Sequence, residues 1–139
     1  MPDTNAIELP SAWKELVAAS RTARANAYAR YSNYNVGAAV LTASGDIFAG
    51  CNVENASYGL TICAERGAVC AAVAAGQNDI IAACVSLTGQ PVPCGTCRQF
   101  LYEFNREMTL LLDNLDLPDA PHPEVVCLAE LLPRGFSLE

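Results

Sequence analysis

Three cysteines and one glutamate stand at spacings that suit a metal-dependent hydrolase. Cys63 and Glu65 belong to a C-A-E motif, and Cys94 and Cys97 lie in a P-C-G-T-C motif. Three protein ligands leave one position of a tetrahedral zinc ion open, which is typical of a catalytic rather than a structural zinc. We therefore predict that Cys63, Cys94 and Cys97 bind one Zn²⁺ per chain.

Glu65 is the candidate proton carrier. It follows Cys63 by two residues, so its carboxylate need not be a fourth ligand and can face a water at the open position. From there it would accept the water proton and return it to the reacting molecule. Zinc deaminases use a non-ligand glutamate beside their Cys or His ligands in this way. A solvated glutamate in a first helical turn is the alternative.

Two arginines directly follow these motifs. Three thiolates give zinc more electron density than three imidazoles, which weakens its effect on a bound water. Arg66 and Arg98 could reach back to the cysteine sulfurs and withdraw negative charge. The alternative is that both are surface arginines in solvent.

Other uses of the cysteines stay open at this point. A lone C-x-x-C motif also occurs in redox proteins, although these need neither a third cysteine nor a neighbouring glutamate. A closed structural zinc site would need a fourth ligand, such as Cys51 or Cys70. The cysteines outside the two motifs otherwise read as buried thiols.

The elements around these residues alternate between helical and strand patterns. We expect helices over residues 11–30, beginning at a Ser N-cap, over 63–75, ending at Gly76, and from about Cys94 onward. We expect strands on both sides of a turn at 43–46, over 79–89, over 108–113 and near 125–127. This order predicts an α/β sandwich with a mixed sheet between helical layers.

Composition limits the kind of protein. The 139 residues are 52% apolar, enough for the core of a single domain spanning 1–139. The net charge of −7 argues against nucleic acid as a partner. No apolar run reaches the ~20 residues of a membrane span, and residues 1–10 do not resemble an export signal. We expect a soluble, cytoplasmic protein without a membrane partner.

The chain resembles the short, three-cysteine, zinc-dependent cytidine deaminases from about Tyr31 to Phe136. The matching motifs are YSNYNVGAAV (31–40), GCNVENASY (50–58), CAER (63–66), PCGTCRQ (93–99) and LLPRGF (131–136). The resemblance implies a three-layer α/β/α sandwich with a mixed five-stranded sheet. It also implies hydrolytic replacement of the 4-amino group of cytidine or 2′-deoxycytidine by oxygen, in pyrimidine salvage.

The resemblance also assigns roles to residues in these motifs. Asn52 and Glu54 resemble the pair that binds the ribose hydroxyls, and Ala64 and Glu65 resemble the groups that read the base edge. The other residues placed around the substrate or the metal are Tyr34, Tyr58, Phe136 and Gln99. Where Tyr34 and Asn35 stand, the family commonly has Phe-Pro, which leaves the preferred nucleoside open.

The resemblance further implies a homotetramer in which Phe136 reaches toward the substrate of a neighbouring subunit. Phe136 follows helix-breaking Pro133 and Gly135 close to the C-terminus, so periodicity does not assign it to the core. Two other functions stay open: a deaminase of the same fold that acts on a modified cytosine nucleoside or nucleoside antibiotic, and a non-enzymatic zinc-stabilised binding module.

Overall fold

The computed structural model describes residues 10–120 and 122–139. The expectation about an export signal therefore lies almost wholly outside the described residues. The helices are α1 (Ser11–Arg24), α2 (Ala64–Ala74), α3 (Gly95–Tyr102) and α4 (Leu128–Leu131), with a short 3₁₀ helix η2 (Tyr58–Leu60). The strands are β1 (Gly37–Thr42), β2 (Ile47–Cys51), β3 (Ile80–Leu87), β4 (Thr109–Asn114) and β5 (Glu124–Cys127).

The five strands form one mixed sheet in the order β2-β1-β3-β4-β5. β3 and β4 run parallel, and the other neighbouring pairs run antiparallel. Parallel neighbours need a crossover connection, and α3 provides it. The mixed five-stranded sheet predicted above is confirmed.

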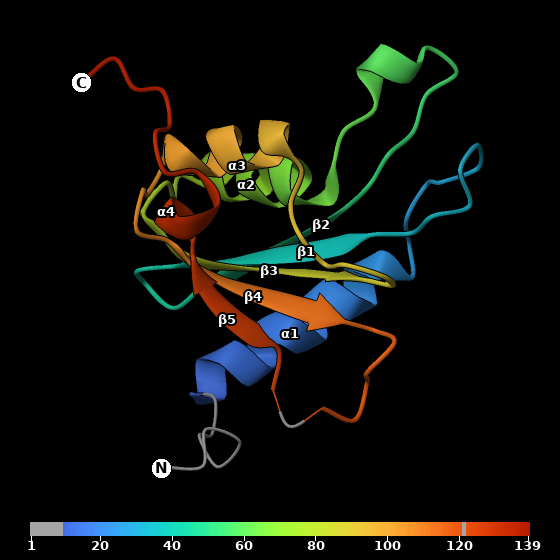
Figure 1. Cartoon of the computed structure of the whole chain (residues 1–139), viewed down its shortest axis with the longest axis horizontal. Helices are drawn as coiled ribbons and strands as arrows, with labels where there is room; N and C mark the ends of the chain where they lie inside the picture. The colour runs from blue at the N-terminus through green and yellow to red at the C-terminus, as the bar shows by residue number, and fades with distance from the viewer. Residues whose placement is uncertain (1–9, 121) are drawn as a thin grey trace.

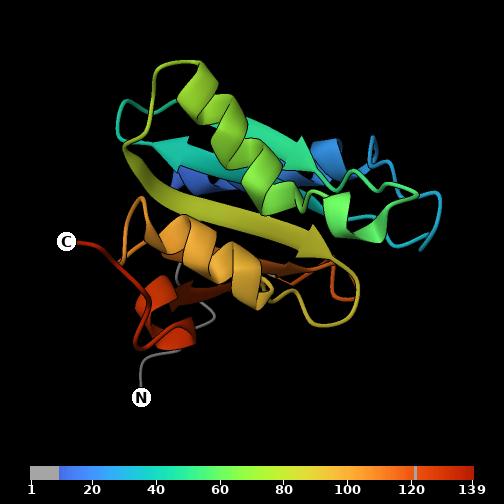
Figure 2. The ribbon, with the colours of Figure 1, turned by 90° about the horizontal axis from the view of Figure 1, so that it is seen from above.

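Helices cover both faces of the sheet, which gives three layers. Figure 1 shows α1 on one face and α2 and α3 on the other. Seen from above, α2 and α3 lie side by side over the sheet (Figure 2). One apolar core forms between the sheet and α2, α3 and α4, and a second forms between the sheet and α1. In the part of the chain that is described, no helix is both apolar enough and long enough to span a bilayer.

The first helix is shorter than predicted. It ends at Arg24, whereas the pattern favoured a helix to residue 30. The backbone of Tyr28 instead pairs with distant partners: its N–H donates to Asn52 O and its carbonyl accepts from Glu54 N. The expected Ser N-cap is also wrong, because Pro10 is the N-cap residue and Ser11 is already helical.

A close helix–strand contact fixes the position of α2. A Cβ at Gly50 on β2 would lie 2.6 Å from Ala64 O and 2.5 Å from Ala68 N. Only glycine therefore lets the first turn of α2 approach the sheet this closely. The far end of α2 is closed as predicted by Gly76, whose φ of 83° is left-handed.

Candidate active site

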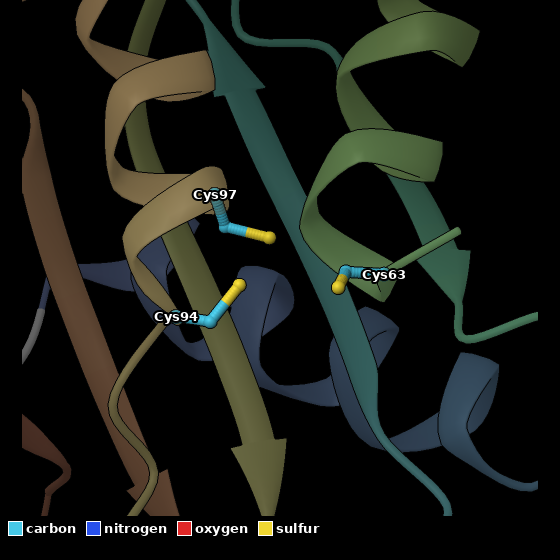
Figure 3. A group of neighbouring side chains, drawn as sticks. All are labelled: Cys63, Cys94 and Cys97. Atoms are coloured by element: carbon cyan, nitrogen blue, oxygen red, sulfur yellow. The ribbon is translucent and has the colours of Figure 1, made fainter. Parts of the chain in front are cut away.

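The three predicted ligand cysteines come together between α2 and α3. Cys63 is the N-cap residue of α2, Cys94 is the N-cap residue of α3, and Cys97 lies in the first turn of α3. Their sulfur atoms point toward one another (Figure 3) and all lie within 4.8 Å of each other. Two helix N-termini thus meet at the cluster, and their positive dipole ends stabilise thiolate charge.

The donor set fits zinc. Tetrahedral Zn–S bonds of ~2.3 Å place sulfur atoms roughly 3.8 Å apart, which is compatible with the observed cluster. A hydrogen bond from Cys97, supported by Arg66, lowers the pKa of Cys63 to about 5, while the same contact raises the pKa of Cys97. Within the described residues, no fourth Cys, His, Asp or Glu joins the group. A closed four-ligand site is therefore not supported.

The four cysteines outside the cluster have different surroundings. Cys84 is buried in β3, as expected for a structural thiol. Cys70, by contrast, is exposed on α2, so the prediction that it is a buried thiol is wrong. Cys51 and Cys127 are partly buried. All seven cysteines are free.

Glu65 lies in the first turn of α2 and is only 6% exposed. Burial raises the pKa of its carboxyl above the ordinary value, and the neighbouring Cys63 adds to the shift. Its side chain lines a small cavity together with Pro93 and apolar residues of β3 and β4. A buried carboxyl with a raised pKa beside a metal-type cluster is a suitable group to hold and transfer a proton.

The two arginines have different roles in the structure. Arg66 donates from Nη2 to Cys63 Sγ at 3.5 Å and to Thr61 O at 3.2 Å, so its guanidinium contacts a ligand sulfur as predicted. Arg98 instead donates to two carbonyls, Pro93 O at 2.7 Å and Leu131 O at 2.9 Å. These bonds hold the backbone just before Cys94 and connect α3 to α4. The Arg98 guanidinium, which was expected to face the cysteine sulfurs, is thus bonded to backbone carbonyls.

Gln99 is also directed away from the cysteines. Its Nε2 donates to Phe136 O at 2.9 Å, and its Oε1 accepts from Phe136 N at 3.0 Å. It therefore holds the C-terminal segment against α3. The Phe136 ring itself is 67% exposed, which agrees with its predicted place outside the core.

The two groups expected to bind ribose are held by the loop at residues 31–36. Asn52 donates from Nδ2 to Tyr34 O at 2.8 Å and accepts at Oδ1 from Val36 N at 2.9 Å. Glu54 accepts from the backbone N–H groups of Tyr31 and Ser32 at 2.9 and 3.1 Å.

Ser32 was not identified from the sequence. Its hydroxyl donates to Glu54 Oε2 and accepts from Tyr34 N. The residue lies inside the YSNYNVGAAV motif, but a serine in a loop gives no chemical signal of its own. Only the folded chain brings it to the carboxylate.

The remaining predicted substrate residues lie on segments around the cluster. The hydroxyl of Tyr34 donates to Thr88 O, in the segment that leads to Cys94. Tyr58 is 76% exposed and meets the Tyr31 ring edge-on, with centroids 6.2 Å apart. Ala64 is fully buried at the start of α2.

Two cavities differ in their chemistry. One of about 330 Å³ lies beside Glu54, lined by Tyr31, Ser32 and Tyr58 among others. A wider one of about 560 Å³ lies between α1 and the β4–β5 connection. No cysteine lines either cavity, but the first is lined by Glu54, one of the residues expected to bind the substrate.

Comparisons with known proteins agree with this site. Residues 11–112 match the cytidine and deoxycytidylate deaminase zinc-binding region. A cytidine deaminase of Sporosarcina psychrophila is 45% identical over 131 residues, covering 91% of this chain and 92% of the relative. A cytidine deaminase of Mycobacterium tuberculosis is 41% identical, covering 100% of this chain and 95% of the relative.

A solved structure is equally similar. The cytidine deaminase of Burkholderia pseudomallei superposes with a TM-score of 0.81 at 42% identity, covering 88% of this chain and 98% of that one. This protein belongs to the cytidine and deoxycytidylate deaminase family.

Proposed function

We propose that this protein catalyses the zinc-dependent hydrolytic deamination of cytidine and 2′-deoxycytidine to the corresponding uridines. One observation carries the proposal: three clustered thiols that can hold a metal with one open position, next to a buried glutamate that is not part of the cluster. Relatives that are 41–45% identical over most of the chain are cytidine deaminases.

The chemistry follows from these groups. Zinc held by the three thiolates supplies Lewis acidity that eases the loss of a proton from water. Glu65 accepts that proton and delivers it to the ring nitrogen N3 while the water oxygen bonds to C4. Glu65 then transfers the second water proton to the amino group. The C4–N4 bond breaks, ammonia leaves, and the oxygen stays on the ring.

Arg66 and the burial of Glu65 support these steps. The guanidinium at Cys63 Sγ offsets the negative charge of three thiolates. The pKa of Glu65 is raised toward neutral pH, and a general acid and base is most effective when its pKa lies near the pH at which the enzyme works.

The same proposal includes recognition of a ribose. A carboxylate accepts about four hydrogen bonds, and the loop at residues 31–36 uses three at Glu54. Asn52 likewise keeps one donor and one acceptor beyond its two loop bonds. These free positions suit sugar hydroxyls and favour a nucleoside over free cytosine.

We propose further that the enzyme is a homotetramer whose sites are completed by Phe136 of a neighbouring subunit. Large apolar side chains are exposed on the two loops beside the site and on the C-terminal segment. They are Tyr28, Tyr31, Tyr34, Val53, Tyr58, Leu60, Ile62, Phe136 and Leu138. Exposed large apolar side chains on these segments are available for contact with neighbouring subunits.

The proposed setting is pyrimidine salvage in the cytoplasm. Seven free thiols, three of them gathered as metal ligands, suit a reducing compartment. The acidic charge of −7 suits a small-molecule substrate better than a nucleic acid.

The proposal is tested by incubating the zinc-loaded protein with cytidine, 2′-deoxycytidine, cytosine and 5-substituted cytidines while absorbance and ammonia are followed. Rapid turnover of the first two, with little of cytosine, is the expected result. Turnover of a modified nucleoside alone would favour the alternative substrate, and no turnover of any would favour a binding module. Light scattering on the active protein tests the tetramer, because a mass near 14.7 kDa would exclude shared sites.

A further inference from the structure

Ser32 joins the two groups that enclose the sugar end of the site. Its hydroxyl donates to Glu54 Oε2 and accepts from Tyr34 N at 3.0 Å, while its backbone N–H donates to Glu54 Oε1 at 3.1 Å. Both oxygens of the Glu54 carboxylate are therefore fixed by this one residue. The orientation of the carboxylate plane follows from Ser32.

Glu54 is partly exposed, and the hydrogen bonds from residues 31 and 32 are what restrain its carboxylate. These hydrogen bonds, chiefly the one from the Ser32 hydroxyl, lower the pKa of Glu54 and keep it an ionised acceptor. Tyr31 N also donates to Oε1. A rotation about the last side-chain bond would break the Ser32 contact and turn the free acceptor position away from the site.

The loop that carries Ser32 is itself anchored at its other end. Asn52 holds Tyr34 O and Val36 N, and the Tyr34 hydroxyl donates to Thr88 O. Ser32 is thus supported by a fixed backbone. Its hydroxyl couples the orientation of Glu54 to the position of the aromatic side chain at residue 34.

We propose that Ser32 is a positioning residue that directs the Glu54 carboxylate toward a ribose hydroxyl and so gives the enzyme its preference for hydroxylated sugars. This inference rests on the proposed function, because it assumes that a cytosine nucleoside occupies the site. Ser32 acts through Glu54 and does not itself contact the reacting atoms.

The test compares Ser32→Ala with wild type on two substrates, cytidine and 2′,3′-dideoxycytidine, which lacks both hydroxyls. For cytidine we expect kcat/KM to fall roughly tenfold through KM, which is the size of one lost hydrogen bond to a charged group. For the dideoxy substrate we expect little change in kcat/KM, because this substrate has no 2′- or 3′-hydroxyl that could donate a hydrogen bond to Glu54. Zinc content and kcat should stay the same.

Two further variants separate positioning from a general effect on the loop. Ser32→Thr keeps the hydroxyl and should retain the cytidine preference. In a Glu54→Gln background, Ser32→Ala should lower kcat/KM for cytidine little further, because the carboxylate through which Ser32 acts is already gone. Thermal unfolding of each variant checks that the fold is intact.

The outcomes are distinct. An equal fall on both substrates would mean that Ser32 only maintains the loop, and no fall on either would mean that Glu54 needs no such support; each overturns the Ser32 role alone. A zinc-loaded wild type that leaves cytidine unchanged overturns the proposed function and the Ser32 role with it.

Discussion

Gln99 and Phe136 are joined by two reciprocal hydrogen bonds, although 37 residues separate them in the chain. The side-chain amide of Gln99 pairs with the backbone N–H and carbonyl of Phe136 in the manner of a neighbouring strand. Gly135 packs on the Tyr102 ring so closely that a Cβ there would lie 2.7 Å from ring atoms. The helix that carries Cys94 and Cys97 therefore also fixes the C-terminal aromatic.

Gln99→Ala should loosen the segment that presents Phe136 without disturbing the metal. Losing two hydrogen bonds of about 1 kcal/mol each should raise KM for cytidine roughly tenfold, with kcat and zinc content nearly unchanged. Initial rates and elemental analysis measure these quantities. Arg106→Ala is the comparison variant, because Arg106 hydrogen-bonds to Ser137 and Glu139 beyond Phe136 and lies over the Tyr102 ring, but makes no hydrogen bond to Phe136. Equal effects of the two variants would contradict the specific role of Gln99.

Cys94→Ala should abolish stoichiometric zinc binding, because two thiolates hold zinc much more weakly than three. Cys70→Ala is the control: it changes an exposed thiol on α2 outside the cluster. Elemental analysis of both purified variants provides the comparison. Full zinc content in the Cys94 variant would remove this cysteine from the ligand set.

The metal cluster was predictable from the sequence because its information is local. Cys63 and the Cys94–Cys97 pair each sit where a helix begins, and helix starts have residue signals of their own. The strands were predictable for a related reason, since β3 and β4 are nearly continuous apolar runs. Residue type and short spacing were enough in both cases.

The remaining features depend on distant contacts. The end of α1 was mispredicted because residues 25–30 continue a helical composition, and only the pairing of Tyr28 with the segment after β2 ends the helix. Arg98 and Gln99 follow the P-C-G-T-C motif as Arg66 follows C-A-E, yet contacts with α4 and the C-terminal segment turn them away from the sulfurs. Such partners are set by packing, which neighbouring residues do not encode.

Arg21 should contribute to stability but not to catalysis. Its guanidinium makes a bidentate contact with Asp113 at 2.7 and 2.8 Å, and Ser86 donates to the same carboxylate at 2.6 Å. Asp113 is only 2% exposed, so Arg21→Gln leaves a buried charge poorly compensated. We expect a loss of about 2 kcal/mol in the free energy of unfolding.

Urea unfolding measures the effect, with exposed Lys14→Gln on the same helix as the control. The variant should deaminate cytidine at the wild-type rate, because α1 lies on the opposite face of the sheet from α2 and α3 (Figure 1), whose first turns hold the cysteine cluster. A large fall in kcat with an unchanged free energy of unfolding would contradict the prediction that Arg21 contributes to stability and not to catalysis.

The raised pKa of Glu65 gives the metal-free protein a defined pH dependence. Its folded pKa lies above the unfolded value of about 4.5, so this group favours the folded state at low pH and loses that contribution as pH rises toward the folded pKa. Glu65→Gln cannot ionise. Its stability relative to wild type should therefore be greater at about pH 8 than at about pH 4. Denaturant unfolding at both pH values tests this, and a pH-independent difference would contradict it.

The most direct test of the whole account is the rate at which zinc-loaded Glu65→Gln deaminates cytidine, measured by absorbance at the same zinc content as wild type. We expect one zinc per chain in both proteins and a fall in kcat of at least ~100-fold, which is typical of losing a general acid and base. Wild-type turnover in the glutamine variant would contradict it, because the proton would then be moved by some other group.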